Sequence, residues 1–166
     1  SMLRLADAKF LAGCSGMVLD YAAREPFWRR GLNYNHGTGH GVGYLGNIHE
    51  APIGFRWKAT RDAMCEIEPG MVITDEPGIY IEGSHGIRIE NELLVCAGEK
   101  NEYGQFLYFE PLTFVPIDLD ALRPELMTEE EKQLLNAYHQ SVYEKISPYL
   151  EAEEKEWLKE YTRLVK

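Results

Sequence analysis

The chain has 166 residues, 45% of them hydrophobic, which suffices for one domain with a real core and excludes intrinsic disorder. Its formal net charge of −10 argues against nucleic acid or an anionic membrane as a partner. The three cysteines are scattered along the sequence, which is typical of proteins from a reduced compartment. No apolar run reaches the ~18 residues that a membrane span needs. We therefore expect a single cytoplasmic domain over residues 1–166. Residues 1–2 are as consistent with a remnant of cloning as with a native start of the domain.

Helical spacing of apolar residues dominates the start of the chain, and residues 3–31 are expected to be helical. Ser15 can cap one segment, Pro26 can open a further turn, and Gly31 can end the helical region. Residues 32–57 are rich in glycine and poor in helix formers, so no helix is expected there.

The period of the sequence changes to that of strands after residue 70. Residues 71–77 and 86–96 are expected to form two strands joined across residues 82–85. Residues 106–115 resemble a third strand, in which Pro111 marks an edge or a bulge because proline cannot donate to a sheet.

The last part of the chain returns to helical patterns. Thr128 and Glu131 have the spacing of a capping box, which predicts a helix start at this point. Ser147-Pro148 marks a kink or a new helix start, and residues 151–163 are expected to be helical and highly charged. Residues 128–163 therefore form a C-terminal helical extension of an α+β domain.

Two histidines lie in the glycine-rich segment His36-Gly-Thr-Gly-His40-Gly-Val-Gly. In an extended chain four residues span roughly 13 Å, so His36 and His40 cannot bind the same ion. One of them can bind a metal while the other lines the same cleft, and the glycines permit close approach of backbone or substrate. The segment alone fits a glycine-rich turn with solvated histidines at least as well.

Two glutamates stand out further along the chain. Glu76 precedes Pro77-Gly78, which places a carboxylate at a strand end, although Glu-Pro-Gly is also a common turn. Glu90 and Arg88 share one face of the expected strand 87–95, where a carboxylate is costly unless it is paired or bound to metal. A solvated Arg–Glu pair is the alternative for that face.

The conjunction of these motifs is more specific than any one of them. Imidazole and carboxylate groups are suitable ligands for manganese, cobalt or zinc. His49, in the sequence Ile-His-Glu-Ala-Pro, is a group that supports the metal ligands, a donor to an oxyanion or an ordinary loop histidine. A hydrolytic two-metal site needs more ligands than the three that stand out here, so the sequence indicates most of one metal site.

Residues 36–43, 48–52, 68–80 and 86–91 together resemble the pita-bread metallopeptidases, and most closely the aminopeptidase P (Xaa-Pro aminopeptidase) group. The resemblance extends over essentially residues 3–163. It implies the C-terminal portion of a pita-bread catalytic domain: a curved, mainly antiparallel sheet backed by helices and followed by C-terminal helices.

The resemblance also implies roles for individual residues. His40 and Glu76 match ligands of one metal, and Glu90 matches the carboxylate that bridges both metals. His36 and His49 match histidines that grip the substrate and the tetrahedral intermediate, and Arg88 matches an arginine that orients the site. 

The family's other two ligands are aspartates that precede this region. Asp7 and Asp20 stand in helical sequence at the wrong place to match them.

The function implied is removal of the N-terminal residue from peptides with proline in second position. Two divalent ions, manganese first and cobalt or zinc next, would serve the whole enzyme, which is expected to be a cytoplasmic homodimer with peptide substrates. This fragment is expected to bind metal weakly and to be inactive. The alternatives are a prolidase (Xaa-Pro dipeptidase) and a non-catalytic pita-bread binding module.

Overall fold

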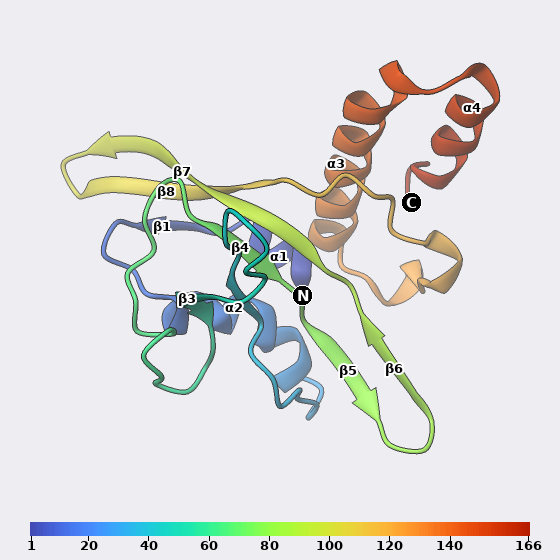
Figure 1. Ribbon diagram of the computed structural model, residues 1–166. Coiled ribbons are helices and arrows are strands. Elements are labelled where there is room, and N and C mark those ends of the chain that lie inside the picture. The colour runs from blue at the N-terminus through green and yellow to red at the C-terminus, as the bar shows by residue number, and fades with distance from the viewer. The chain divides into compact units, whose positions relative to one another are not determined.

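The computed structural model describes residues 1–166, which divide into two compact units, Ser1–Thr113 and Phe114–Lys166 (Figure 1). The boundary lies before the predicted helical extension at residue 128. None of the helices has the length and apolar character that crossing a bilayer requires.

The first unit contains two helices, a six-stranded sheet and a separate two-stranded hairpin. Its elements are α1 (Met2–Ala6), β1 (Lys9–Leu11), α2 (Gly16–Trp28), β2 (Gly39–Gly41), β3 (Glu50–Phe55), β4 (Val72–Asp75), β5 (Gly78–Ile81), β6 (His85–Arg88), β7 (Asn91–Asn101) and β8 (Gly104–Pro111).

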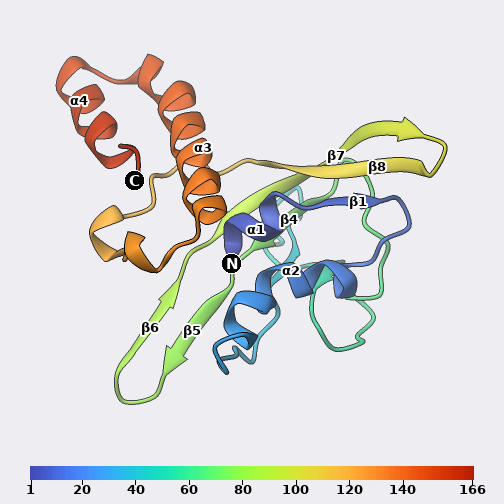
Figure 2. The same cartoon turned by 180° about the vertical axis from the view of Figure 1, so that it is seen from behind.

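The sheet has the order β1-β8-β7-β4-β2-β3, and every neighbouring pair is antiparallel. Helices α1 and α2 lie on one face of it, in front in Figure 2 and behind in Figure 1, while the β5–β6 hairpin, which connects the central strands β4 and β7, projects beyond the ends of these strands. Side chains from α2 and from the sheet form one buried core, which includes Leu19, Phe55, Ile73 and Leu93. The predicted α+β architecture with a mainly antiparallel sheet is confirmed.

The prediction of helix through residues 3–31 is wrong at residues 9–11, which form a strand. Phe10 is 6% exposed and lies opposite Leu107 of β8, so pairing with the sheet outweighs the local helical pattern. Pro26 lies inside α2 instead of opening a new turn, and Gly31 has φ +67°, a value that favours glycine, just beyond the helix.

Four strands, not two, occupy residues 71–96. Strand β4 pairs with β7, and between them the chain makes the β5–β6 hairpin, whose turn at residues 82–84 falls within the predicted connection at residues 82–85. Glu90 was expected on a strand, but it lies between the end of β6 and the start of β7. Strand β8 ends at Pro111 instead of continuing to residue 115, in agreement with the effect of proline on strand pairing.

The second unit is largely helical, as the sequence predicts. The predicted capping box is present: Thr128 accepts a hydrogen bond from the Glu131 N–H, and the Glu131 carboxylate accepts one from the Thr128 N–H. The elements are the short 3₁₀ helices η1 (Leu119–Ala121), η2 (Pro124–Leu126) and η3 (Ser147–Tyr149), with α3 (Glu129–Ile146) and α4 (Ala152–Tyr161).

His139 on α3 is fully buried in this second unit. Its Nε2 accepts a hydrogen bond from the Ile117 N–H at 3.0 Å, so that nitrogen carries no proton. Burial lowers the pKa of His139 below its usual value, because the imidazolium would lose its hydration. The fold therefore binds the neutral form of this side chain.

A buried ion pair on α2 holds the segment that leads into the site. Asp20 and Arg24 are both 0% exposed, and the Arg24 Nε lies 2.5 Å from the Asp20 Oδ2. The two Arg24 Nη groups donate to the backbone carbonyls of Tyr34 at 2.7 Å and His36 at 2.8 Å. One guanidinium thus joins α2 to the backbone on either side of residue 35.

Thr38 extends this network to the site. Its hydroxyl donates to the second Asp20 oxygen at 2.6 Å and lies 2.6 Å from the Tyr34 hydroxyl. The Thr38 carbonyl accepts a hydrogen bond from the Glu76 N–H at 2.7 Å. One hydrogen-bond network therefore connects helix α2, residues 34–38 and the end of β4.

Replacing Arg24 by methionine should lower the free energy of unfolding by about 3–5 kcal/mol, because Asp20 would remain buried without its partner. Urea unfolding measures the change. Arg30→Met is the matched control, since Arg30 is exposed and should change stability by less than about 0.5 kcal/mol. Equal losses in the two variants would contradict the role given to the buried pair.

The free energy of unfolding should fall as the pH drops below about 6.5, where His139 in the unfolded chain takes up a proton and the folded chain does not. Urea unfolding near pH 7.5 and near pH 5.5 tests this. His139→Gln keeps an acceptor for the Ile117 N–H and should lose part of the pH dependence, whereas replacing the exposed His85 should not. A pH dependence unchanged in His139→Gln would refute the assignment.

Candidate metal centre

One cavity of about 500 Å³ in the first unit brings most of the predicted site residues together. Strands β2, β5 and β6 contribute to it, with segments that flank β2, β3 and β4. The residues that line it are His36, Gly37, Gly39, His40, His49, Arg56, Glu76, Tyr80 and Arg88. Of the predicted residues only Glu90 is outside this lining, and it contacts the cavity through Arg88.

The ring of His40 is fixed in one tautomer by its own strand. Its Nδ1 lies 2.9 Å from the Gly41 carbonyl oxygen, which can only accept, so Nδ1 carries the proton. The Nε2 lone pair is then directed at the Glu76 Oε1, 3.3 Å away. Two electron-rich atoms face each other at this distance only with a proton or a cation between them, and metal-binding histidines are oriented in this way.

The glycine before His40 allows this strand to approach β4. A Cβ at Gly39 would lie 1.7 Å from the Thr74 carbonyl oxygen, so no other residue fits without moving the backbone. The His40 N–H donates to the Thr74 hydroxyl at 3.1 Å, and that hydroxyl donates to the Glu76 Oε1 at 3.2 Å. Thr74 thus connects the two candidate ligands.

Arg88 lies between the two predicted carboxylate ligands. Its Nε is 4.0 Å from the Glu76 Oε2 and 3.3 Å from the Glu90 Oε2. A hydrogen bond with Tyr80, together with the charges of the nearby acids, raises the pKa of Arg88 above its usual value. Arg88 therefore offsets the repulsion of the two carboxylates.

The other two histidines line the same cavity as His40. The Nδ1 of His36 is 2.6 Å from the Gly37 carbonyl, and its Nε2 is buried without a partner. Its ring lies 5.3 Å from that of Tyr80, and the His49 ring lies 4.2 Å from that of His40. The structure therefore places His36 and His40 in one cavity, as expected for histidines that do not share an ion.

The donor set fits part of a metal site. His40 and Glu76 supply an oriented imidazole and a carboxylate, the chemistry that manganese, cobalt and zinc accept. No three His, Cys, Asp or Glu side chains are gathered closely enough to form a complete ion-binding group. Asp20, which the sequence already placed outside the ligand set, is occupied by Arg24 and Thr38.

Two residues of the site were missed from the sequence. Asp75 is fully buried on β4, and neither carboxyl oxygen has a hydrogen-bond partner. Burial raises the pKa of Asp75 well above its usual value; the positive N-terminus opposes this to a smaller extent, and the nearby acids Glu76 and Glu90 add to it. The signal was a charged residue at the end of an apolar strand.

Tyr80, which contacts both His36 and Arg88, gave no signal beyond its place in a hairpin strand.

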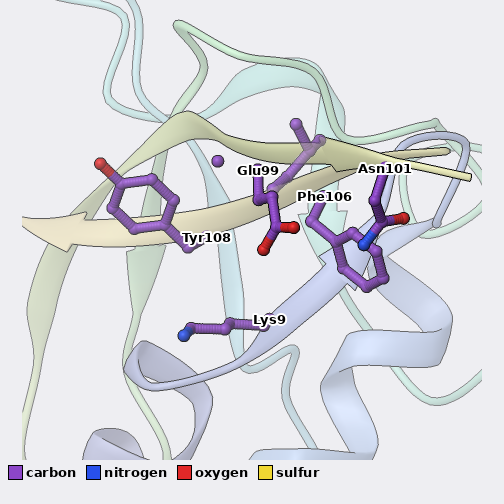
Figure 3. Close-up of a pocket in the computed structure, with 7 residues that line it drawn as sticks. Lys9, Glu99, Asn101, Phe106 and Tyr108 are labelled. Carbon is purple, nitrogen blue, oxygen red and sulfur yellow. The ribbon is translucent and has the colours of Figure 1, made fainter. Parts of the chain in front are cut away.

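A second cavity, of about 480 Å³, lies along β7 and β8. Figure 3 shows Lys9, Glu99 and Tyr108 around it. Its lining contains one carboxylate and no imidazole, so it does not offer the ligands of the candidate metal centre.

Residues 2–97 match the metallopeptidase family M24, and residues 105–165 match the C-terminal region of peptidase_M24. A probable Xaa-Pro aminopeptidase P from Talaromyces marneffei is 44% identical over 99% of this chain and 26% of its own length. One from Ajellomyces dermatitidis is 42% identical over 98% of this chain and 27% of its own length. The chain thus spans about a quarter of the length of these curated relatives.

Solved structures give the same result. The chain is similar to an X-prolyl aminopeptidase from Caenorhabditis elegans, described as a cytosolic enzyme with a di-nuclear active site. The TM-score is 0.88 and the identity 37%, over 99% of this chain and 27% of that one. An Xaa-Pro dipeptidase from Bacillus anthracis matches with a TM-score of 0.54 and 34% identity over 71% of this chain and 29% of that one. The predicted pita-bread fold is confirmed, and the chain belongs to metallopeptidase family M24.

Proposed function

We propose that this chain is the C-terminal part of the catalytic domain of an Xaa-Pro aminopeptidase, which removes the N-terminal residue from peptides with proline in second position. The observation that carries the proposal is the His40 Nε2 lone pair, which faces the Glu76 carboxylate at 3.3 Å. That geometry can accommodate a cation between the two side chains, and the relatives that match nearly the whole chain are named Xaa-Pro aminopeptidase P.

His40, Glu76 and Glu90 are the residues that would hold metal. When bound, two divalent ions would lower the pKa of a water molecule and polarise the scissile carbonyl. Glu90 would reach them once its contact with Arg88 rearranges, while His40 and Glu76 are already oriented. Manganese is our first choice of ion, with cobalt and zinc next.

The remaining side chains would handle the peptide. His36 has a buried Nε2 that lacks a donor, so it would accept a hydrogen bond from a substrate N–H. His49 lies beside His40 and would donate to the developing oxyanion on the carbonyl before proline. Arg88 would orient the site through its contact with Glu76.

The chain supplies only part of this machinery. We propose that two aspartate ligands come from an N-terminal portion of a longer polypeptide, as the length of the relatives suggests. By itself the 166-residue chain would bind metal weakly, because two carboxylates repel each other where no cation neutralises them. The whole enzyme would be a cytosolic homodimer. The alternatives to the aminopeptidase function are a prolidase and a non-catalytic binding module.

The longer polypeptide should hydrolyse a tripeptide such as Ala-Pro-Ala in the presence of manganese, and the isolated 166 residues should not. Glu90→Gln in the longer polypeptide should lower kcat by about 100-fold or more, because a bridging ligand loses its charge. The exposed hairpin residue Glu82 provides a carboxylate control, and Glu82→Gln should leave kcat unchanged.

Three results would count against the assignment. Comparable turnover by the isolated chain would remove the need for further ligands. Preference for the dipeptide Ala-Pro over Ala-Pro-Ala would indicate a prolidase, and absence of hydrolysis with either peptide would favour a binding module.

Metal binding to the isolated chain can be tested without activity. Cobalt(II) should bind weakly at His40 and Glu76 and give a visible absorption band. His40→Gln should weaken binding by about tenfold or more, since the imidazole ligand is lost. His85→Gln serves as the control because His85 lies on the exposed hairpin. Equal cobalt affinity of the two variants would exclude His40 as a ligand.

A further inference from the structure

Arg56 lies in the cavity of the candidate metal centre, and the metal chemistry does not use it. It directly follows Phe55, the last residue of β3, which is 0% exposed and whose carbonyl accepts a hydrogen bond from the Thr38 N–H at 2.8 Å. The backbone at residue 56 is therefore fixed by the core and by the segment that carries His36. The Arg56 side chain is exposed and lines the cavity.

The side chain lies across the backbone of Gly37. A Cβ at Gly37 would lie 2.9 Å from the Arg56 Cζ and 3.1 Å from its Nε. Glycine at this position thus leaves room for the guanidinium to lie flat against the chain, next to His36. A long side chain that packs along its length loses less freedom when it binds a ligand.

Arg56 has no ion pair or hydrogen bond within the chain, unlike the other two arginines near the site. Arg24 is bound by Asp20, and Arg88 contacts Glu76 and Glu90. The carboxylates of the cavity are therefore already engaged by other groups. Arg56 presents a planar fork of N–H donors that is suited to a carboxylate from outside the chain.

We infer that Arg56 forms a carboxylate-binding subsite for the peptide substrate. This inference rests on the proposed function. The N-terminal amine of a peptide is cationic and would be repelled by the guanidinium. The carboxylate must therefore come from the C-terminus of a short peptide or from an acidic side chain, and short or acidic Xaa-Pro peptides are the favoured substrate class.

The test measures binding of matched peptides to the 166-residue chain by NMR titration. The probes are Ala-Pro-Ala as the free acid, Ala-Pro-Ala-amide, Ala-Pro-Glu-amide and Ala-Pro-Gln-amide. The free acid should bind about threefold to fivefold more tightly than its amide if the C-terminus is bound, as expected for a partly exposed ion pair. Ala-Pro-Glu-amide should exceed Ala-Pro-Gln-amide by a similar factor if a side chain is bound.

Arg56→Gln should remove the preference, and Arg56→Glu should reverse it. Arg61→Gln is the matched control, because Arg61 is an exposed arginine that does not line the cavity. It should keep the full preference. Equal affinity for the charged and neutral members of both pairs, absence of binding, or a preference that survives in Arg56→Gln would overturn the subsite.

The same peptides distinguish this subsite from the proposed function. Hydrolysis by the longer polypeptide without any difference between acid and amide would keep the aminopeptidase and reject the subsite. A binding preference that depends on Arg56, in a protein that hydrolyses none of these peptides, would keep the subsite and reject the activity.

Discussion

The buried Asp20–Arg24 pair is the interaction on which the geometry of the site depends. Buried ion pairs add little net stability on average, but removal of one partner is costly. Here the guanidinium also binds the backbone carbonyls of Tyr34 and His36, so the pair specifies the path of the segment that contains His36. Because Thr38 links the same network to Glu76, helix α2 determines where two residues of the site lie relative to each other.

The second constraint is the contact between the His40 Nε2 and the Glu76 carboxylate. The Gly41 carbonyl fixes the tautomer, Gly39 allows the close approach to β4, and Thr74 bonds to both partners. Both side chains are thus held by the backbone and by Thr74 in the orientation that a shared cation would need. Asp75, at the end of β4 next to Glu76, is buried and has no hydrogen-bond partner for either oxygen.

The sequence predicted the local features well, because histidines, glycines and turn residues act within a few positions of one another. The capping box at Thr128, the turn after Ile81 and the end of β8 at Pro111 are of this kind. The strand at residues 9–11 could not be predicted, since only its pairing with β8 makes it a strand.

The sequence indicated several residues that line the cavity, but it did not predict how they are arranged. Spacing alone could not show that Glu90 lies between two strands and is held by Arg88. Asp20 and Arg24 have the spacing of an ordinary surface pair on a helix, and they are buried only because residues 34–38 fold over them. The sequence also gave no sign of Arg56, because its position in the cavity depends on the space that Gly37 leaves by having no side chain.

The central claim is that His40, Glu76 and Glu90 bind metal in the longer polypeptide. A crystal structure of that protein loaded with manganese, with anomalous scattering to locate the ions, tests it directly. We expect the His40 Nε2 and a Glu76 oxygen at about 2.0–2.2 Å from one ion, and Glu90 in contact with both ions. Ions bound elsewhere, or an ion near Glu76 with His40 still turned to the protein, would contradict the account.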